Sequence, residues 1–433
     1  MDVVSALDLN AIYASYEGGD GRGMSAYAPA MMVRVLLYGY ATGVYSSRKL
    51  EAKTYDEVAF RYLSADAHPD HDTFAEFRKR HLEALAGLFT EALLLCEKAG
   101  LVKLRHLSID GTKIKANTSK HKAMSYARMG ETEQRLKQEI EALLRQAEDV
   151  DAAEDAEYGK GKRGDELPDE LARRESRLKK IAQAKAELEQ EAREKVERER
   201  AAAEAKVAER RDEEQRTGKK KRGREPHVPD PEQAKPTPNA QRNFTDPDSR
   251  IMPDGANKGS FVQGCNAQAA VDSKALIIVA AEVTQQTTDN HQLLPMLAQV
   301  KENQGRKPKR ASVDAVYWSK ANATDEGVAA IDLHIATGRE KQEEKIAPKS
   351  GPPPGEVTAK VAMRQKLSSQ AGRSIYKMRK AIVEPVFRQI KEQRGFRRFG
   401  LRGLANVRCE WKLVCLASNL LKLFGSGWRP QIA

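Results

Sequence analysis

The sequence has few cysteines, few aromatic residues and no long apolar run. Its four cysteines, Cys96, Cys265, Cys409 and Cys415, form no CxxC pair, which favours reduced thiols over a zinc centre. No stretch reaches the roughly 18 apolar residues that a membrane span requires. The first residues also lack the basic start and apolar core of a secretion signal. We therefore expect a cytoplasmic protein that does not contact a membrane.

The sequence has an excess of positive charge. Across 433 residues, 74 Lys and Arg outnumber 62 Asp and Glu, so the formal net charge is +12. This excess favours a polyanionic partner such as nucleic acid, but it does not distinguish DNA from RNA or from an acidic membrane. The length is sufficient for about two or three domains, each with its own core.

Helical periodicity predicts an all-helical domain over residues 1–100. Apolar residues recur at spacings of three and four around residues 32–40 and 74–89. Between these segments, the stretch His-Pro-Asp-His-Asp-Thr contains a proline turn. Either Asp72 or Thr73 is expected to cap the helix that follows this turn.

A charged helical insert is predicted over residues 126–218. Its section from 131 to 216 has 26 acidic residues, 20 basic residues and one aromatic side chain. Regularly spaced apolar residues and the glycines between 159 and 168 predict two helices folded back as an antiparallel hairpin or coiled coil. An acidic insert binds phosphate poorly, so a structural or dimerising role is favoured over DNA contact. Residues 219–249, with the run KKKRGR and several prolines, predict a basic linker.

The remaining residues, 101–125 and 250–433, predict one α/β domain that the insert divides. Alternating patterns predict strands through Asp110, over 259–272 and 275–283, up to Asp314, and over 334–337. Helical patterns predict helices over 291–300 and about 320–331, and a closing helix around Glu384. This order of strands and helices is the ribonuclease H-like arrangement.

Three carboxylates lie where this arrangement would bring them together. Asp110 lies within the first strand, Asp314 ends a strand expected beside it, and Glu384 lies on a helix expected to pack on the sheet. Carboxylates are ligands that Mg²⁺ prefers, and two such ions can cleave a phosphodiester; Mn²⁺ can substitute for them. Any one of these acids alone would more often be structural or solvated.

Positive charge is concentrated around and after the predicted closing helix. Between Tyr376 and Arg408 there are ten basic residues and only two glutamates. Arg397 and Arg398, which lie between two phenylalanines, and the following Arg402 suit a phosphate-binding edge. The alternative is the edge of a core with a solvated basic face.

Several blocks, in order, resemble bacterial insertion-sequence transposases of the DDE type. SIDGTKIKAN is similar to the first-aspartate motif of that family, DAVYWS to the second-aspartate block and IVEPVFRQIK to the glutamate block. NFTDPDSRIM and GCNAQAAVD resemble blocks between them. YAPAMMVRVLLYGYATGVYSSRKLE and HPDHDTFAEFRKRH resemble the helical, DNA-binding domain at the start of many such enzymes. The resemblance implies that Asp110, Asp314 and Glu384 are the catalytic residues and bind two Mg²⁺ ions.

The glutamate block also implies contacts with transposon-end DNA. The family pattern has a Tyr and an Arg before the glutamate and a Lys seven residues after it, matched here by Tyr376, Arg379 and Lys391. Arg379 lies five residues before Glu384, whereas the related signature has this arginine four before, where Lys380 stands. At 100° per residue, Lys391 lies about 20°, Lys380 about 40° and Arg379 about 140° from Glu384 around the helix. Arg379 and Lys380 both remain candidates.

The resemblance further implies an order of reaction steps. The enzyme would bind terminal inverted repeats, cut the strand at their ends and use the freed 3′-hydroxyl to attack target DNA. It would act as a homodimer or higher oligomer on double-stranded DNA. The alternatives are a ribonuclease H-like nuclease or resolvase, and a non-catalytic DNA-binding or coiled-coil scaffold derived from a decayed transposase.

Overall fold

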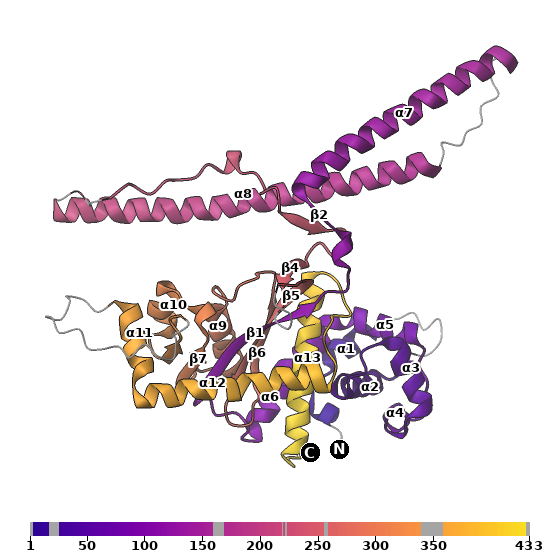
Figure 1. The fold of residues 1–433 in the computed structure, drawn as a ribbon. Helices are drawn as coiled ribbons and strands as arrows, with labels where there is room; N and C mark the ends of the chain where they lie inside the picture. Colours follow the sequence, from indigo (N-terminus) through magenta and orange to yellow (C-terminus); the bar gives the residue numbers. More distant parts are fainter. Residues whose placement is uncertain are drawn as a thin grey trace. The chain divides into compact units, whose positions relative to one another are not determined.

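The chain divides into two compact units. A computed structural model describes residues 3–16, 26–158, 169–218, 220, 223–254, 259–338 and 358–429. Residues 1–117 and 251–433 form the first unit, and residues 118–250 form the second (Figure 1). Within the described residues, no helix is both long enough and apolar enough to cross a membrane.

A mixed sheet lies at the centre of the first unit. Its strands are β1 (Leu107–Lys115), β4 (Arg250–Pro253), β5 (Phe261–Asp272), β6 (Ile278–Thr284), β7 (Arg310–Val313) and β8 (Asp332–Ile335). β5, β1, β7 and β8 are neighbours in that order, and β4 and β6 both pair with β5. The pairs β1–β5 and β5–β6 are antiparallel, whereas β1–β7 and β7–β8 are parallel. The mixed sheet confirms the predicted α/β character of this region.

The crossover segments of the sheet are helical. α9 (Leu293–Gln304) joins β6 to β7 and packs against β5 and β6. α10 (Lys320–Thr324) and the short 3₁₀ turn Glu326–Val328 join β7 to β8. The single helix predicted over about 320–331 is therefore interrupted, because Asp325 adopts an extended conformation and caps the second turn.

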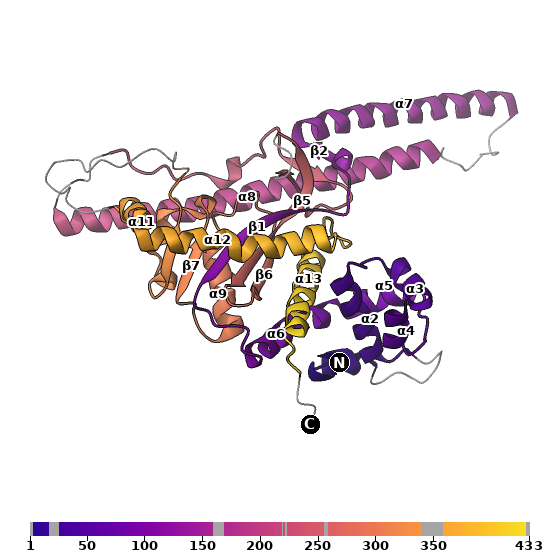
Figure 2. The same cartoon turned by 60° about the horizontal axis from the view of Figure 1, so that its bottom comes forward.

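A long helix, α12 (Gln370–Arg388), packs along β1 (Figure 2). It follows α11 (Ala359–Ser368), and the Ser369 side chain caps its first turn by accepting a hydrogen bond from Gly372 N at 3.0 Å. Its apolar face includes the buried side chains of Val383 and Val386. Pro385 lies inside the helix and cannot donate to the carbonyl four residues earlier. The chain then continues through one π-helical turn, Gln389–Gln393.

The N-terminal part of the first unit is helical, as predicted. Its helices are α1 (Asn10–Tyr13), α2 (Pro29–Thr42), α3 (Ser47–Asp56), α4 (Val58–Leu63), α5 (His71–Arg80) and α6 (Leu82–Lys98). The last helix of the chain, α13 (Leu404–Gly425), packs against α2, α6 and β6. One continuous apolar core therefore extends from the N-terminal helices into the sheet. The predicted cap of α5 was wrong: Asp70, not Asp72 or Thr73, caps the helix by accepting from Thr73 N at 2.7 Å.

The second unit is a pair of long helices on a small two-stranded sheet. α7 (Tyr126–Tyr158) and α8 (Asp169–Thr217) follow β2 (Ala123–Ser125), which pairs with β3 (Gln241–Asn243). Tyr126 contacts Glu189, Lys185 contacts Glu133, and Arg174 contacts Glu139, so the two helices are antiparallel. The predicted turn over 159–168 lies outside the described residues.

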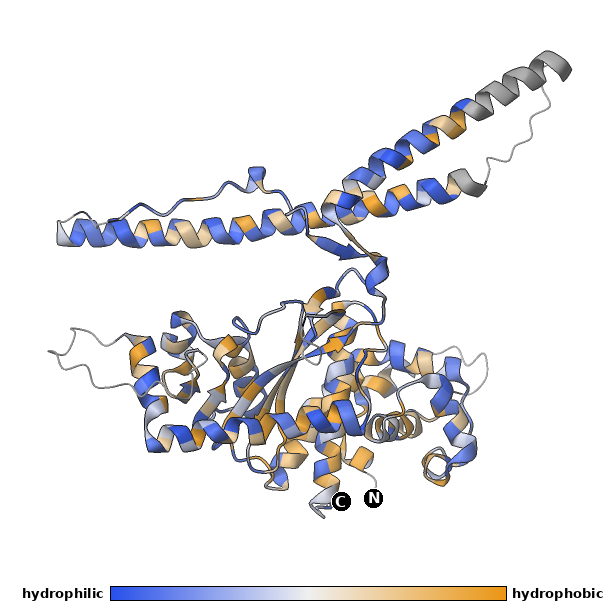
Figure 3. Cartoon of the chain, in the orientation of Figure 1, coloured by the Kyte–Doolittle hydropathy of each residue, from blue (hydrophilic) through white to orange (hydrophobic). Residues whose placement is uncertain are grey.

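The second unit has a small core, and most of the coloured residues of its helices are hydrophilic (Figure 3). Five buried residues form its core: Met129, Leu136, Ile181, Ala184 and Leu188. The C-terminal half of α8 contacts the segment that follows the helix instead of α7. There, Arg210 donates to the carbonyl oxygens of Gly223 and Arg224. Residues 219, 221 and 222 of the predicted basic run lie outside the described residues.

Candidate active site

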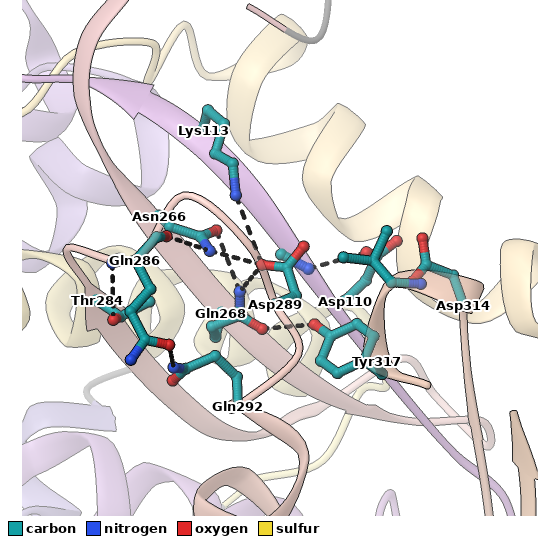
Figure 4. A network of polar contacts seen from close by, with 12 residues as sticks. Asp110, Lys113, Asn266, Gln268, Thr284, Gln286, Asp289, Gln292, Asp314 and Tyr317 are labelled. Carbon is teal, nitrogen blue, oxygen red and sulfur yellow. Dashed lines mark hydrogen bonds and ion pairs between the residues drawn. The ribbon is translucent and has the colours of Figure 1, made fainter. Parts of the chain in front are cut away.

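The parallel pairing of β1 with β7 brings Asp110 and Asp314 together. Ser108 pairs with Ser312, and each aspartate follows its serine by two residues, so both lie at the same level on neighbouring strands. Figure 4 shows the two side chains close to each other. Asp110 Oδ1 accepts from Gly111 N at 2.9 Å, and Asp314 Oδ1 accepts from Val316 N at 2.9 Å. These backbone contacts hold both carboxylates at their strands.

Asp110 has a cationic partner on α12. Arg379 Nη1 lies 3.3 Å from Asp110 Oδ2, and the Arg379 side chain is only 10% exposed. The pKa of Asp110 is raised to about 6 by burial; Arg379 acts in the opposite direction, and the nearby Asp314 and Asp289 raise the pKa further. The carboxylate therefore lies among other acids in a poorly solvated position, where a cation stabilises its ionised form.

Glu384 is exposed and lies further along α12 than Arg379. Among the described residues, no group of three or more His, Cys, Asp and Glu side chains is arranged to hold a metal ion. The structure thus brings together two of the three predicted carboxylates, and it pairs Asp110 with Arg379.

The residues at this position suit a divalent cation of the Mg²⁺ type. The available donors are carboxylate oxygens, which are the hard ligands that Mg²⁺ and Mn²⁺ accept. Burial and the neighbouring acids Asp314 and Asp289 raise the cost of ionising Asp110, and a bound cation would offset that cost. We conclude that the donor set at Asp110 and Asp314 fits the metal implied by the sequence motifs.

A further acid, Asp289, was not identified from the sequence. It lies just before α9, near Asp110, and forms an ion pair with Lys113 with a distance of 3.5 Å between Oδ1 and Nζ (Figure 4). The pattern of β5 contains a signal that could have led to it. Asn266 and Gln268 are polar, two residues apart, and lie in the buried middle of the strand, so their side chains require polar partners.

The predicted DNA contacts around Glu384 lie in different environments. The Arg379 guanidinium lies over the ring of Tyr376, 5.8 Å from its centroid, and both side chains are largely covered. Burial raises the pKa of Tyr376. Lys380 is exposed. Lys391 is half-buried and donates from Nζ to the carbonyl of Lys113 at 2.9 Å, and burial lowers its pKa.

The three arginines predicted after this helix are all exposed. Arg397 and Arg398 alternate with Phe396 and Phe399, whose rings are almost fully buried and meet edge to face. Arg397 forms an ion pair with Glu392. Arg402 Nε donates to the carbonyl of Asn117 at 2.9 Å. Both predicted features, a core edge and a basic exposed face, are therefore present in the same segment.

Glu410 holds this segment in place from within the core. Its carboxylate is fully buried and accepts from the backbone N–H groups of Gly400 and Leu401, each at 3.0 Å. The backbone of this segment also pairs with Lys115 at the end of β1: Lys115 N donates to Arg397 O, and Phe399 N donates to Lys115 O. The exposed arginines thus extend from a fixed backbone beside the end of β1.

Two regions of the chain match known families. Residues 2–80 match the family described as Transposase domain (DUF772), and residues 355–424 match the family described as Transposase DDE domain. No curated protein matches the chain, and no solved structure does so either. Both matched families are transposase families. They confirm the resemblance to insertion-sequence transposases of the DDE type that the sequence motifs predicted.

The DDE match covers one part of the candidate site. It contains Glu384 and the predicted DNA contacts from Tyr376 to Arg402, whereas Asp110 and Asp314 lie outside it. The pairing of β1 with β7 is the observation that places the two aspartates together.

Proposed function

We propose that this transposase binds the terminal inverted repeats of its element, cuts DNA at their ends and joins the freed 3′ end to target DNA. The observation that carries the proposal is the level placement of Asp110 and Asp314 on paired strands. The sheet order supports a ribonuclease H-like catalytic domain formed by residues 101–125 and 250–433: β1 has antiparallel β5 and β6 on one side and parallel β7 and β8 on the other. Residues 1–100 would be the DNA-binding helical domain.

The path of α12 supports Glu384 as the third carboxylate. Ser108 Oγ donates to the Arg379 carbonyl at 3.3 Å, and Lys391 Nζ donates to the Lys113 carbonyl, so the helix and β1 run in the same direction. Asp110 lies two residues beyond Ser108, roughly 7 Å along the strand. The same advance along the helix from Arg379 corresponds to between four and five residues at about 1.5 Å each. By this reckoning, Val383 and Glu384 lie beside Asp110 along the direction of the strand.

The exposed position of Glu384 fits this role. Val383 is buried, whereas Glu384 beside it is exposed, and Lys391 in the following π-helical turn reaches β1. In the proposed metal-bound state the Glu384 side chain would turn toward Asp110. Pro385 immediately after Glu384 also interrupts the helical hydrogen bonding, which favours local adjustment there.

Each residue has a distinct task in the proposed reaction. Asp110, Asp314 and Glu384 would hold two Mg²⁺ ions, with Mn²⁺ as a substitute; when bound, such ions polarise the phosphate and activate the nucleophile. Lys380, Lys391 and Tyr376 would hold the transposon end next to the carboxylates. Arg397, Arg398 and Arg402 would contact phosphates farther along the duplex. Arg379 neutralises Asp110 in the absence of metal.

The proposal is tested with substitutions that remove a ligand without adding bulk. Asp110→Asn, Asp314→Asn and Glu384→Gln should each abolish Mg²⁺-dependent cleavage of a plasmid that carries the element's ends, while binding to an end duplex stays near normal. Asp325→Asn and Glu302→Gln are matched controls, because both acids are exposed in the same unit. Substantial cleavage by one of the three variants would remove that residue from the site.

Two further outcomes would redirect the proposal. Cleavage by the wild-type protein at any sequence, without preference for the ends, would indicate a nuclease. Absence of cleavage by the wild-type protein in both Mg²⁺ and Mn²⁺, with end binding retained, would indicate a DNA-binding scaffold.

A further inference from the structure

A buried polar network lies behind the strand that carries Asp110 (Figure 4). Gly111 and Lys113 of β1 pair with Gln268 and Asn266 of β5. Because side chains alternate along a strand, Gln268 and Asn266 lie on the opposite face of the sheet from Asp110. Both side chains are buried, so their amides require partners within the protein.

Asp289 is the acceptor at the centre of this network. Its Oδ1 accepts from Asn266 Nδ2 at 2.5 Å and from Gln268 Nε2 at 2.6 Å, and Lys113 Nζ lies 3.5 Å away. An ionised carboxylate can only accept hydrogen bonds. Asp289 therefore determines the orientation of the Gln268 amide, with Nε2 toward the carboxylate and Oε1 pointing away from it.

The other end of the Gln268 amide reaches Tyr317. Gln268 Oε1 accepts from the Tyr317 hydroxyl at 2.6 Å, and Tyr317 is fully buried. Tyr317 ends the 3₁₀ turn Ala315–Tyr317, which the Asp314 side chain caps. A hydrogen-bonded path therefore leads from Asp289 to the turn that follows the second predicted catalytic aspartate.

A second, independent link joins the same two segments. The buried side chain of Asn322 donates to the carbonyl of Asn290 at 2.7 Å and to the carbonyl of Tyr317 at 2.8 Å. The segment that carries Asp289 and the turn after Asp314 are thus connected twice. One connection runs through the Gln268 side chain, and the other through the Asn322 side chain, which binds a backbone carbonyl of each segment.

The network needs the absence of a side chain beside Asp110. A Cβ atom at Gly111 would lie 2.2 Å from Gln268 Nε2 and 2.6 Å from Asp289 Oδ1. Both distances are far below van der Waals contact, so any other residue at this position would displace the network. Glycine next to the catalytic aspartate therefore has a role in the packing of the site.

We propose that Asp289 is a positioning residue of the active site: through Gln268 and Tyr317, its carboxylate holds the turn that carries Asp314 in register with Asp110. The inference rests on the proposed function. Metal ligands must be held within roughly 0.5 Å of their productive geometry, and loss of a supporting hydrogen bond typically lowers metal affinity about 10- to 100-fold. Replacement of Asp289 by Asn gives the Gln268 amide a neutral partner and releases its orientation.

The experiment measures metal binding by the full-length protein. Mn²⁺ is titrated without DNA and followed by electron paramagnetic resonance, for the wild type, Asp289→Asn and Tyr317→Phe. We expect Mn²⁺ affinity to fall about 10-fold in both variants. Cleavage should then require a higher Mg²⁺ concentration, while end binding in EDTA stays unchanged. Asp325→Asn is the matched control, since this exposed acid also caps a 3₁₀ turn.

The outcomes separate the inference from the proposed function. Tyr317→Phe keeps the buried ring and loses one hydroxyl, so it decides the question even if Asp289→Asn fails to fold. Normal Mn²⁺ affinity and normal Mg²⁺ dependence in Tyr317→Phe, with only a lower melting temperature, would reduce the network to a structural role and overturn the inference. If the wild type itself does not bind Mn²⁺, the proposed function fails, and the inference fails with it.

Discussion

The guanidinium of Arg379 lies between the carboxylate of Asp110 and the ring of Tyr376. Nη1 is 3.3 Å from Asp110 Oδ2, and the guanidinium carbon is 5.8 Å from the centre of the ring. Its Nε is buried without a hydrogen-bond partner among the described residues. In this arrangement Arg379 serves as the counter-ion of the carboxylate, whereas Lys380 beside it faces solvent.

These environments predict different salt dependences for the two residues. In EDTA, Lys380→Ala should flatten the slope of log affinity against log salt by about 0.9, the value for one phosphate contact. Arg379→Ala should leave the slope unchanged, because Asp110 already holds its charge. Fluorescence anisotropy with an end duplex measures both. A larger change for Arg379 would show that it leaves Asp110 to contact DNA.

The exposed arginines after α12 should bind phosphate without reading sequence. Arg397→Ala/Arg398→Ala should flatten the same slope by about two units and weaken binding to all duplexes alike. Of the single variants, Arg398→Ala should weaken binding more, because Arg397 must give up its exposed ion pair with Glu392 before it contacts a phosphate. Lys301→Ala, an exposed site on α9, is the control. An unchanged slope in the double variant would assign this segment to the solvated surface alone.

His106 should make the first unit sensitive to mild acid. The residue is 4% exposed and lies 2.9 Å from Ser312 Oγ, and burial lowers its pKa to about 4, assisted by Arg310. The unfolded chain takes up this proton near pH 6.5, whereas the folded protein does not until about pH 4. Stability is therefore lost as the pH falls through that window.

The contribution of His106 can be measured by urea unfolding. Between pH 7 and pH 5 the free energy of unfolding should fall by about 2 kcal/mol from this residue. His106→Gln does not titrate and can still reach Ser312, so it should show a smaller fall over the same range. His334, whose pKa burial also lowers, would account for a remaining decrease. Equal falls in the two proteins would contradict the assignment.

The first unit should fold without the second. Among the described residues, its apolar core contains none from the segment between 118 and 250, and the helix pair has a separate core. Replacement of residues 118–250 by a Gly/Ser bridge should therefore leave a cooperative thermal transition, observed by circular dichroism. If the helix pair dimerises the protein, the same deletion should lower the mass measured by light scattering. Loss of cooperative unfolding would show that the first unit depends on the second.

Periodicity in the sequence located the strands and helices of the site well. Asp110 was predicted within a strand and Asp314 at the end of one. In the structure, Asp110 lies within β1 and Asp314 directly follows β7. The prediction succeeded because apolar and polar residues alternate along such strands, and polar residues mark where the strands end. Cap positions were less certain: Asp70, Asp72 and Thr73 are all competent caps, and only the backbone conformation of Asp70 selects among them.

The spacing of residues in the sequence could not predict which side chains contact one another within the site. Helical geometry indicated that Arg379 and Glu384 point in different directions, but it did not reveal which of them meets Asp110. That depends on how far α12 is advanced along β1, which the contacts of Ser108 and Lys391 determine. Asp289 was missed for a similar reason, because it lies on an irregular segment and meets Asn266 and Gln268 only through tertiary packing.

The position of the helix pair between β1 and β5 also bears on how the chain assembles as it is synthesised. A flexible connection of that length would make closure of the β1–β5 pair slow, since the entropic cost grows with the number of free residues. Pairing of β2 with β3 shortens the effective connection between β1 and β5. The other edge of β1 must wait until β7 has been made. Asp110 is therefore synthesised early but acquires its neighbour Asp314 late, and a nascent chain would not bring the two aspartates together until its last third emerges.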